Sequence, residues 1–576
     1  MTERDVLSKF LLEAKSYKSY SDIERLVEDQ KDLSMVPIQP LYIALLKSST
    51  DQVAEVLPKL SNKQRQAFLD IDLWEKDHVD VNSFEYWIEV YSKVSDSNLI
   101  QDFVSSEDFL IYLKSRVNIY TFDVEDPEYP DHDNYFLTDD NLLLIEFFEE
   151  YTYKNELKYL LRSLYDRFGV ENAYSILFKL VNDSFSVLEE DQYQKKKDRL
   201  RELGFVDYFD ALEQTRMFVS YKQIDKFIAS KSTLTPDLDV YTKNQSLHGS
   251  SLTSFDETME KIYTELAKVR DEKRQYFLKF NFLRLINSTI TLNNALRGGS
   301  ILLTRIGKGT KSFIELGLEK VMQQKSFPSE NGEELFELFD FFDLYRIGKS
   351  LIFLEKNKIK KALRDTPFEQ NDFEYFLGSW WSTFLENADF DIPKVKAFGA
   401  ALHAKEVNNY QSYLFWKTQV SIFKDSIPFI SSFFKMLEKL KTDGKLHDEF
   451  YLNYEVSNID FEAVIISSFV NYALGHFSGN DVNKMGVTIS ELKDFFKQYF
   501  DIKEGEYILK SFENAKVNKL CLDFIEQFGF YEIENFEKYL YGILSEHLSG
   551  YEFDTLADED FKHIGGPIIL NSLNEN

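Results

Sequence analysis

The sequence predicts a mainly α-helical protein with a superhelical, helical-repeat-like N-terminal region, a small β-hairpin insertion and a larger helical C-terminal lobe. Glycine and proline are scarce, at 22 and 11 of 576 residues, which argues against a fold built from tight turns and short strands. Apolar residues recur at helical spacing through most of the chain. Aromatic residues make up 16% of the sequence, and their rings supply large apolar areas for packed cores.

Residues 1–115 show short amphipathic helices separated by polar turns. The segments 37–47, 52–60 and 63–69 place apolar residues at helical spacing. The runs Ser49-Thr50-Asp51 and Ser61-Asn62 supply N-cap chemistry between these segments. Because such short helices cannot bury their apolar faces alone, we expect them to stack on one another in a superhelical region.

Residues 116–150 break the helical pattern and predict a small β element. The segments 117–122 and 135–138 are rich in residues that favour strands, and 142–145 reads as a return strand. Asp139-Asp140-Asn141 is a turn signal before that strand. We therefore expect a β-hairpin or a three-stranded sheet that carries an acidic loop at 123–133.

The rest of the chain returns to helices. Residues 151–230 are expected to complete the N-terminal lobe, with a helix that stops at Gly204 before the apolar Phe205. Ser, Thr, Asn and Gly dominate 231–254, which predicts a linker or long loop. Residues 255–566 form the predicted helical C-terminal lobe, and 567–576 form a tail.

The charge balance limits the kinds of partner that the chain can bind. The chain carries 97 acidic against 67 Lys and Arg residues, a formal net charge of -30. That field repels nucleic acids and anionic membrane surfaces and favours protein partners, basic ones among them, although acidity also serves solubility. No apolar run approaches the roughly 18 residues of a membrane span, and the first residues lack an apolar signal segment. We expect a cytoplasmic protein without membrane insertion, and the oligomeric state stays open.

The single cysteine and the tryptophans predict buried structure. Cys521 alone can form neither an intrachain disulfide nor a cysteine zinc cluster. It lies in the apolar-periodic segment 520–525, where a small buried hydrophobe is expected. Core or inter-helix packing is likewise expected of the five tryptophans, which are Trp74, Trp87, Trp380, Trp381 and Trp416.

The acidic loop is the first candidate site. Hard cations bind several oxygen ligands, which Asp131, His132 and Asp133 could partly supply. The EF-hand spacing fails, because the central Gly and the terminal Glu are absent. His132 between two aspartates also suits a transition metal, but two acidic residues are not a full ligand set. A solvated loop, or a docking surface for a basic partner, is the favoured interpretation.

The glycine-rich segment 297–310 is the second candidate. It departs from the P-loop pattern, since Leu302 stands in place of the first Gly and Gly309 in place of the final Ser or Thr. Ser312 and Glu315 instead predict a capping box that opens a helix near Phe313. Lys308 and Lys311 beside that helix start are candidates for binding an anion, although an ordinary cap is the favoured reading.

No complete catalytic or cofactor motif is present in the sequence. The histidines form no HExxH pair, and no GxSxG elbow occurs. Carboxylate pairs are too numerous in so acidic a chain to indicate acid–base catalysis. The sequence therefore favours a protein without enzymatic activity or cofactor, and it leaves an enzyme open.

Three features together resemble a known family. The run 69–77 with the later Trp87, the acidic loop with its hairpin, and the run 199–205 are similar to a bacterial family described only as a full-length domain of unknown function. That resemblance implies a bacterial cytoplasmic protein and supplies no activity, cofactor or catalytic residue. The stacked short helices are also similar to the N domain of MgtE-type magnesium transporters, by fold analogy alone.

The leading hypothesis from the sequence is a non-enzymatic scaffold or regulator that binds other proteins. It depends on the stacked short helices, the high aromatic content and the lack of a complete catalytic motif. The alternative is a carboxylate-based, metal-responsive module or enzyme that uses the region Asp131–Asp133.

Overall fold

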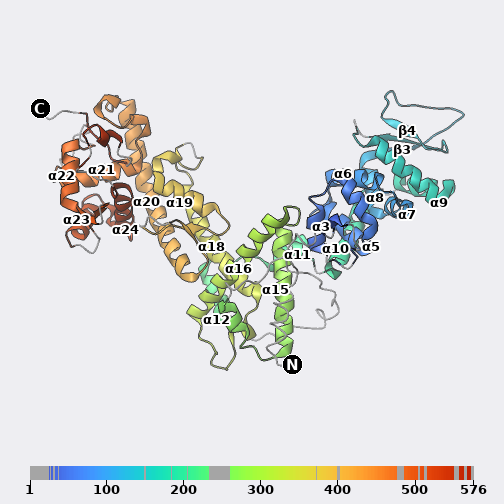
Figure 1. The fold of residues 1–576 in the computed structure, drawn as a ribbon, viewed down its shortest axis with the longest axis horizontal. Coiled ribbons are helices and arrows are strands. Elements are labelled where there is room, and N and C mark those ends of the chain that lie inside the picture. Colours follow the sequence, from blue (N-terminus) through green and yellow to red (C-terminus); the bar gives the residue numbers. More distant parts are fainter. Residues whose placement is uncertain are drawn as a thin grey trace. The chain divides into compact units, whose positions relative to one another are not determined.

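In a computed structural model the chain is mainly α-helical with small antiparallel sheets, as the sequence predicts (Figure 1). The structure describes residues 25, 27–29, 33, 34, 36, 38–147, 151–182, 185–203, 205–231, 260–370, 373–398, 403–476, 486–503, 506–510, 515–550, 555, 557–563 and 567–572. The predicted linker at 231–254 therefore lies outside the described residues, apart from Lys231.

The chain divides into two compact units. Unit 1 consists of Met1–Arg216, Ala229–Ile314 and Lys325–Arg346, and unit 2 of Met217–Ile228, Glu315–Gln324 and Ile347–Asn576. This division differs from one at the predicted linker, because residues 260–314 belong to unit 1. Part of the reason is Arg297, whose guanidinium lies 3.1 Å from Asp80 Oδ2 and 3.5 Å from Asp72 Oδ1.

Unit 1 combines short and long helices with a three-stranded sheet. Its helices are α3 (Ile38–Leu45), α4 (Thr50–Val56), η1 (Leu57–Lys59), α5 (Asn62–Asp72), α6 (Val81–Ser92), α7 (Ser97–Val104), α8 (Glu107–Arg116), α9 (Lys154–Asn182), α10 (Phe185–Glu202), α11 (Tyr208–Gln214), α14 (Glu260–Leu266), α15 (Glu272–Leu292), the first part of α16 (Gly299–Gln324) and α17 (Leu335–Leu338). Its strands are β1 (Trp74–Glu75), β2 (His78–Val79), β3 (Val117–Thr121), β4 (Tyr135–Leu137) and β5 (Leu143–Phe147).

The expected N-caps of the first helices are present. Ser49 caps α4 and forms a capping box with Gln52, whose side chain accepts from the Ser49 backbone at 2.9 Å. Ser61 caps α5 and forms the same box with Gln64 at 2.8 Å. Each box satisfies backbone donors that a helix start would otherwise leave unpaired.

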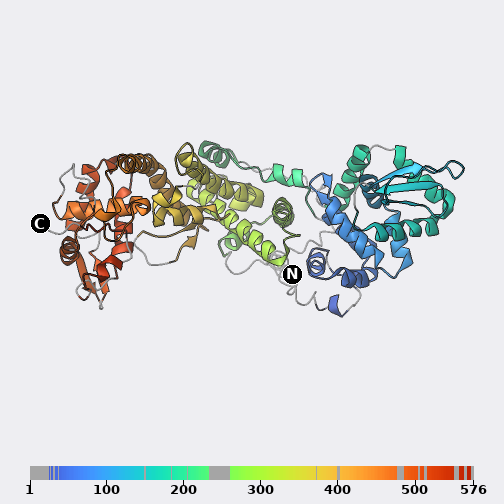
Figure 2. The same ribbon diagram turned by 90° about the horizontal axis from the view of Figure 1, so that it is seen from above.

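The three-stranded sheet confirms the predicted β element. Its strand order is β3-β5-β4 with antiparallel pairing throughout. Because β3 and β4 are the two edges, the loop 122–134 crosses from one edge of the sheet to the other. One face carries the buried Val117, Ile145 and Phe147, and α9 lies beside β3 (Figures 1 and 2).

Unit 2 is helical with two short hairpins. Its helices are α12 (Tyr221–Ser230, to Ile228), the end of α16, most of α18 (Phe341–Leu363), η3 (Glu374–Leu377), α19 (Ser379–Asp389), α20 (Tyr410–Thr442), η4 (Asp448–Phe450), η5 (Val456–Asn458), α21 (Phe461–Ala473), α22 (Ile489–Tyr499), α23 (Ala515–Gln527), η7 (Phe530–Glu532), α24 (Phe536–Leu548) and η8 (Asp560–His563). Strands β6 (Lys394–Val395) and β7 (Lys405–Glu406) pair, as do β8 (Phe500–Lys503) and β9 (Glu506–Leu509).

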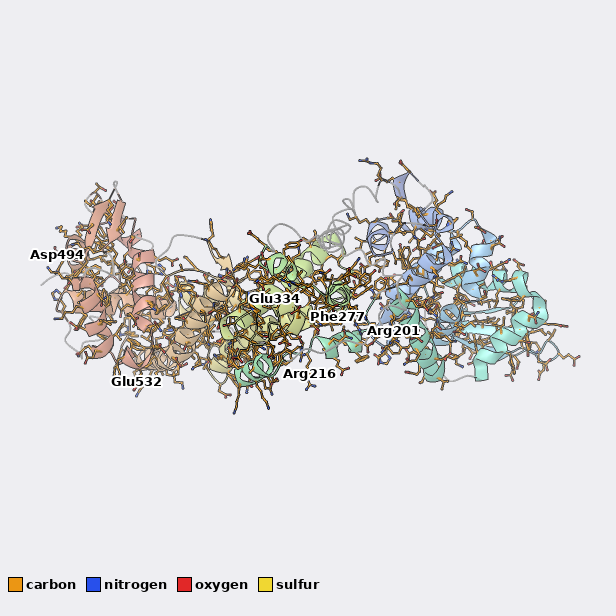
Figure 3. The ribbon with its side chains drawn as sticks, turned by 90° about the horizontal axis from the view of Figure 1, so that it is seen from below. Arg201, Arg216, Phe277, Glu334, Asp494 and Glu532 are labelled. Atoms are coloured by element: carbon orange, nitrogen blue, oxygen red, sulfur yellow. The ribbon has the colours of Figure 1, made fainter. Side chains whose placement is uncertain are left out.

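Aromatic side chains fill the core of unit 2. Charged side chains such as Asp494 and Glu532 lie on its outside (Figure 3). Trp381 is fully buried and stacks on Tyr539 with ring centroids 4.7 Å apart. All five tryptophans of the chain are buried, as expected. Cys521 is also buried, and burial raises the pKa of its thiol to about 12, so it is an inert core residue.

A polar cluster is buried in the same unit. The Glu462 carboxylate accepts hydrogen bonds from the Trp380 backbone N–H at 2.7 Å and from Ser379 Oγ at 3.0 Å, both in the first turn of α19. His547 Nε2 lies 3.0 Å from the same carboxylate. Asp460 is the N-cap of α21, two residues before Glu462. Burial raises the pKa of Asp460 to about 7, and the neighbouring Glu462 charge adds to this effect. A negative charge at a helix start is stabilising, so Glu462 fixes α19 against α21.

Two expectations for local structure are wrong. No helix begins near Phe313, because α16 begins at Gly299 and continues through it. The residues 567–572 are no loose tail: Ile568, Ile569 and Leu570 are buried, and Leu570 forms a parallel bridge with Val487.

Within the described residues, none of the helices is both long enough and apolar enough to cross a lipid bilayer.

Candidate functional site

The acidic loop lies on the polar face of the three-stranded sheet. The loop side chains Asp123, Glu125, Asp126, Glu128, Asp131 and Asp133 are all exposed. Residues 121–150 contain no Lys or Arg, so nothing within the segment neutralises this charge. The cations that reach it come from α9, where Lys154 donates to the Asp133 carbonyl and Arg162 Nε lies 3.4 Å from Asp139.

Glu146 on the central strand β5 holds the loop to the sheet. Its carboxylate accepts from Tyr120 Oη at 3.2 Å and from Asn118 Nδ2 at 3.4 Å, both on β3. His132 of the loop places Nε2 3.0 Å from the other carboxylate oxygen. Burial opposes ionisation of Glu146, but the bonds from Asn118, Tyr120 and His132 outweigh it and lower its pKa below the ordinary value. Glu146 is therefore a fixed negative charge beneath the loop.

Aromatic rings accompany these carboxylates. Phe122, Tyr129 and Tyr135 form a series with centroid distances of 5.3 and 6.0 Å. Tyr129 is 53% exposed, and Tyr120 beside Glu146 is 50% exposed. We call the acidic loop 123–133 together with Tyr120, Tyr135 and Glu146 the acidic sheet face.

The structure does not assemble a cation site from Asp131, His132 and Asp133. His132 uses Nε2 on Glu146, and its Nδ1 accepts from the Asn134 backbone N–H at 3.1 Å. In the part of the chain that the structure describes, no group of three or more His, Cys, Asp or Glu side chains is placed to hold a metal ion. The metal-responsive alternative stays a prediction without a donor set in this structure.

The predicted anion site loses its structural basis. Lys308 and Lys311 both lie within α16, far from its first residue Gly299. The Ser312 hydroxyl donates to the Lys308 carbonyl at 3.2 Å, which is the bond of a serine inside a helix and not that of an N-cap. Neither lysine therefore lies beside the free backbone N–H groups that would bind an anion.

A second polar region of unit 1 surrounds α10, whose basic residues pair with carboxylates of other elements. Arg199 binds both oxygens of the buried Asp70, at 2.9 Å from Nε and 2.7 Å from Nη2. Lys195 binds Glu107 at 2.7 Å, and Lys197 lies 3.2 Å from Asp210. These contacts tie α10 to α5, α8 and α11, so these basic side chains of α10 pair with carboxylates outside the acidic loop.

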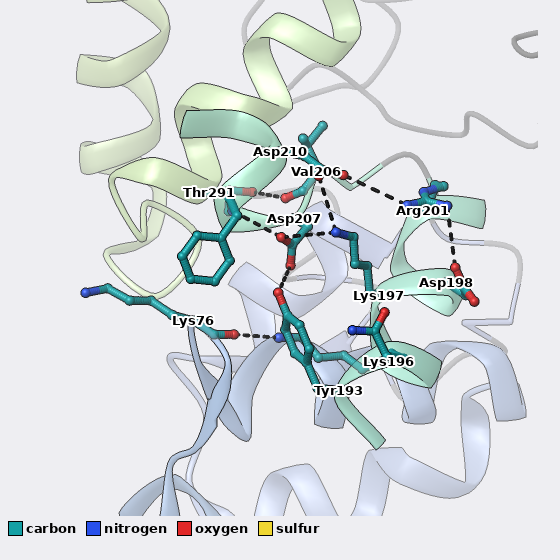
Figure 4. A network of polar contacts seen from close by, with 12 residues as sticks. Lys76, Tyr193, Lys196, Lys197, Asp198, Arg201, Val206, Asp207, Asp210 and Thr291 are labelled. Carbon is teal, nitrogen blue, oxygen red and sulfur yellow. Dashed lines mark hydrogen bonds and ion pairs between the residues drawn. The ribbon is translucent and has the colours of Figure 1, made fainter. Parts of the chain in front are cut away.

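Lys196 differs from its neighbours (Figure 4). Its side chain is buried, with 7% of the residue exposed, and Nζ donates to the Lys76 carbonyl at 3.1 Å. Its charge lies over the rings of Trp74 and Tyr193, at 4.9 and 5.1 Å from their centroids. Burial lowers the pKa of Lys196 to about 8, despite the opposing effects of nearby carboxylates. It lines a cavity of about 250 Å³.

This cavity was not predicted from the sequence. Trp74 was expected only as a core residue, and no role was predicted for Lys196. The run Lys195-Lys196-Lys197 gives no signal of burial, since three successive residues span about 200° and fit on the polar face opposite an apolar stripe about 100° wide.

The fold and these two regions define a helical protein with an acidic, aromatic surface and a small lysine-lined cavity in its described residues. The chain belongs to the family of unknown function DUF6178, which matches residues 13–529. The predicted membership in a full-length domain family of unknown function is thus confirmed. No curated protein and no solved structure matches the chain, so the similarity to the MgtE N domain stays a prediction.

Proposed function

We propose that this protein is a non-enzymatic scaffold or regulator and that its acidic sheet face binds an arginine-rich segment of a partner protein. The observation that carries the proposal is the combination of exposed carboxylates and exposed tyrosine rings on one ordered surface. We place this role in the bacterial cytoplasm, which the family resemblance favours.

Charge complementarity selects a basic partner. The loop and Glu146 present their carboxylates without an intervening cation between Thr121 and Glu150. Exposed ion pairs contribute about 0.2–1 kcal/mol each, so affinity requires several of them together.

Tyrosine exposure favours arginine over lysine in that partner. A guanidinium stacks on aromatic faces and binds carboxylates through two parallel hydrogen bonds, whereas an ammonium acts as a point charge. Tyr120 and Tyr129, each about half exposed, stand among the carboxylates that would form those bonds.

The order of the loop lowers the cost of binding. The contact of His132 with Glu146 and the bond from the Phe147 N–H to the Asn134 carbonyl at 2.8 Å hold the loop against β5. A surface that is already ordered loses less conformational entropy when a partner binds.

The test is binding of a fluorescent nona-arginine peptide and a nona-lysine peptide to the full chain, measured by anisotropy at several salt concentrations. We expect tighter binding of the arginine peptide. Replacement of four loop carboxylates (Asp123→Asn, Asp126→Asn, Asp131→Asn and Asp133→Asn) should weaken it about tenfold, or about 1.4 kcal/mol.

The matched control neutralises four exposed carboxylates of unit 2 (Asp494→Asn, Glu526→Gln, Glu532→Gln and Glu534→Gln), so the net charge changes equally. This control should bind within twofold of the unaltered chain. Equal weakening in both variants would show that the peptide responds to net charge and would refute a binding face at the loop.

A further inference from the structure

The cavity beside Lys196 is lined by four segments of unit 1. The end of α5 and strand β1 form one wall, α10 a second, the entry to α11 a third, and the end of α15 with the residues after it a fourth. Its apolar wall includes Trp74, Leu200, Phe205, Tyr208, Ile290 and Leu296. A volume of about 250 Å³ lies just below the roughly 300–1,000 Å³ of pockets for drug-sized ligands, so only a small molecule fits.

Lys196 is the buried amine of this wall. The Lys76 carbonyl accepts one of its hydrogens, and the Trp74 and Tyr193 rings stabilise its charge. An ammonium carries three hydrogens, and the part of the chain that the structure describes offers them one acceptor, this carbonyl.

The carboxylates near Lys196 are engaged by other donors. Asp70 is held by Arg199 through two bonds. Asp207 accepts from Tyr193 Oη at 2.8 Å and caps α11 through the Phe209 N–H at 3.1 Å. Among the residues that the structure describes, no carboxylate forms an ion pair with Lys196. A buried cation without a counter-ion favours loss of its proton.

The charged groups that face Lys196 come from every element around it. Asp70, Asp77 and Asp207 favour the ammonium, whereas Arg297 and the burial itself favour the neutral amine. Glu75, Lys76 and Lys197 also line the cavity. Burial outweighs the carboxylates, and with a pKa of about 8 about a tenth of the amine is neutral at pH 7.

We propose that Lys196 is a nucleophilic lysine that captures small apolar aldehydes in this cavity as an imine. The apolar walls favour the uncharged part of the ligand, and the buried amine of Lys196 lies in the cavity wall, where a carbonyl carbon can reach it. A desolvated lysine in an apolar pocket is the usual setting of imine-forming amines.

The reaction balances without an oxidant or reductant. The neutral amine attacks the carbonyl carbon, the new C–N bond forms, and the carbonyl oxygen takes up a proton while the nitrogen loses one. The resulting carbinolamine then loses its hydroxyl with a further nitrogen proton. The products are one imine and one water molecule.

The test treats the full chain with benzaldehyde and sodium cyanoborohydride, which transfers hydride to the imine carbon and leaves a stable secondary amine. Peptide mapping by mass spectrometry then compares Lys196 with Lys195 in the same sample. Lys195 is an exposed amine whose pKa is raised by its bonds to Glu107 and Asp191. We expect Lys196 to react at least tenfold faster at pH 7, with a rate that rises with pH to a midpoint near 8.

Three comparisons assign the reaction to the cavity. Periodate-oxidised dextran carries its aldehydes on a polymer that cannot enter the cavity, so it should label exposed lysines but not Lys196. The variant Ala295→Leu narrows the cavity at a fully buried residue and should slow labelling by benzaldehyde tenfold, while Lys196→Arg should abolish it.

The proposal is overturned if Lys196 reacts no faster than Lys195, or if the two aldehydes label it equally. Both outcomes are measured on the unaltered chain, so they test the proposal even if a variant fails to fold. Thermal unfolding of each variant identifies such a failure.

Discussion

His132 in unit 1 and His547 in unit 2 each place Nε2 3.0 Å from a glutamate oxygen, of Glu146 and Glu462 respectively. The two pairs differ in burial: the first has side-chain exposures of 46% and 21%, the second of 16% and 1%. An exposed pair gains little because water competes for both groups. A buried carboxylate that loses its partners is costly. Equal distances therefore carry different energies, and the buried pair fixes the fold while the exposed pair orders a surface.

The largest effect is expected from removal of the buried carboxylate. Glu462→Ala leaves the Trp380 N–H, the Ser379 hydroxyl and His547 without their common acceptor. We expect a loss of about 3–5 kcal/mol in the free energy of unfolding, measured by urea denaturation. Glu146→Ala is the matched exposed control and should cost about 1 kcal/mol or less. Equal losses in the two variants would contradict the comparison.

The backbone beside Glu462 gives the next prediction. Gly378 has φ 86°, and a Cβ there would meet Glu462 Cγ at 2.5 Å. Gly378→Ala should therefore cost about 3 kcal/mol from strain and the displaced carboxylate. Gly444 has φ 64° and no heavy atom within 4 Å of such a Cβ, so Gly444→Ala measures the conformational cost alone, about 1–2 kcal/mol. A Gly378 variant no less stable than the Gly444 variant would refute the steric argument.

The raised pKa of Asp460 predicts that the stability of the fold depends on pH. Its pKa is about 7 in the folded state against 3.8 ordinarily, so the folded chain holds this proton to higher pH than the unfolded chain. The contribution of Asp460 to the free energy of unfolding is about 2–4 kcal/mol. It is fully present below about pH 4 and is lost as the pH rises through 7. Asp460→Asn keeps an N-cap residue and removes the titration. The free energy of unfolding of the variant, minus that of the unaltered chain, should therefore rise from pH 4 to pH 7. A difference that stays constant over this range would disprove the raised pKa of Asp460.

The smallest effect is expected at the exposed pair. His132→Ala should change the free energy of unfolding by about 0.5 kcal/mol or less, measured by urea denaturation. It should nevertheless speed hydrogen exchange in the loop 123–133, because the link from His132 to Glu146 is lost. Unchanged exchange in the loop would show that the other contacts with β5 suffice.

Features that depend on neighbours in sequence could be predicted, and those that depend on distant partners could not. The capping boxes of Ser49 and Ser61 and the strands of the sheet follow from residues within a few positions. The pairs of His547 with Glu462 and of Lys196 with Trp74 join different helices and strands. No local pattern specifies them, so the buried polar cluster and the lysine cavity were missed.

The wrong helix start near Phe313 has a local cause. Ser312 and Glu315 match a capping box, but the buried residues Leu303, Ile306, Thr310, Phe313 and Ile314 continue one helical face across them. Gly307 and Gly309 cost roughly 1 kcal/mol each inside a helix. Burial of about 1.5–3 kcal/mol for each large apolar side chain outweighs that cost.

The strand order β3-β5-β4 also determines how much the acidic loop can vary. The two edges that it joins are about 10 Å apart, whereas residues 122–134 could reach about 40 Å when extended. The connection has surplus length, and doubling a loop adds only about 0.6 kcal/mol of closure entropy. Insertions at the exposed segment 124–128 can therefore reshape the proposed binding surface while leaving the strand register intact. This loop is the place where partner specificity can change with the smallest loss of stability.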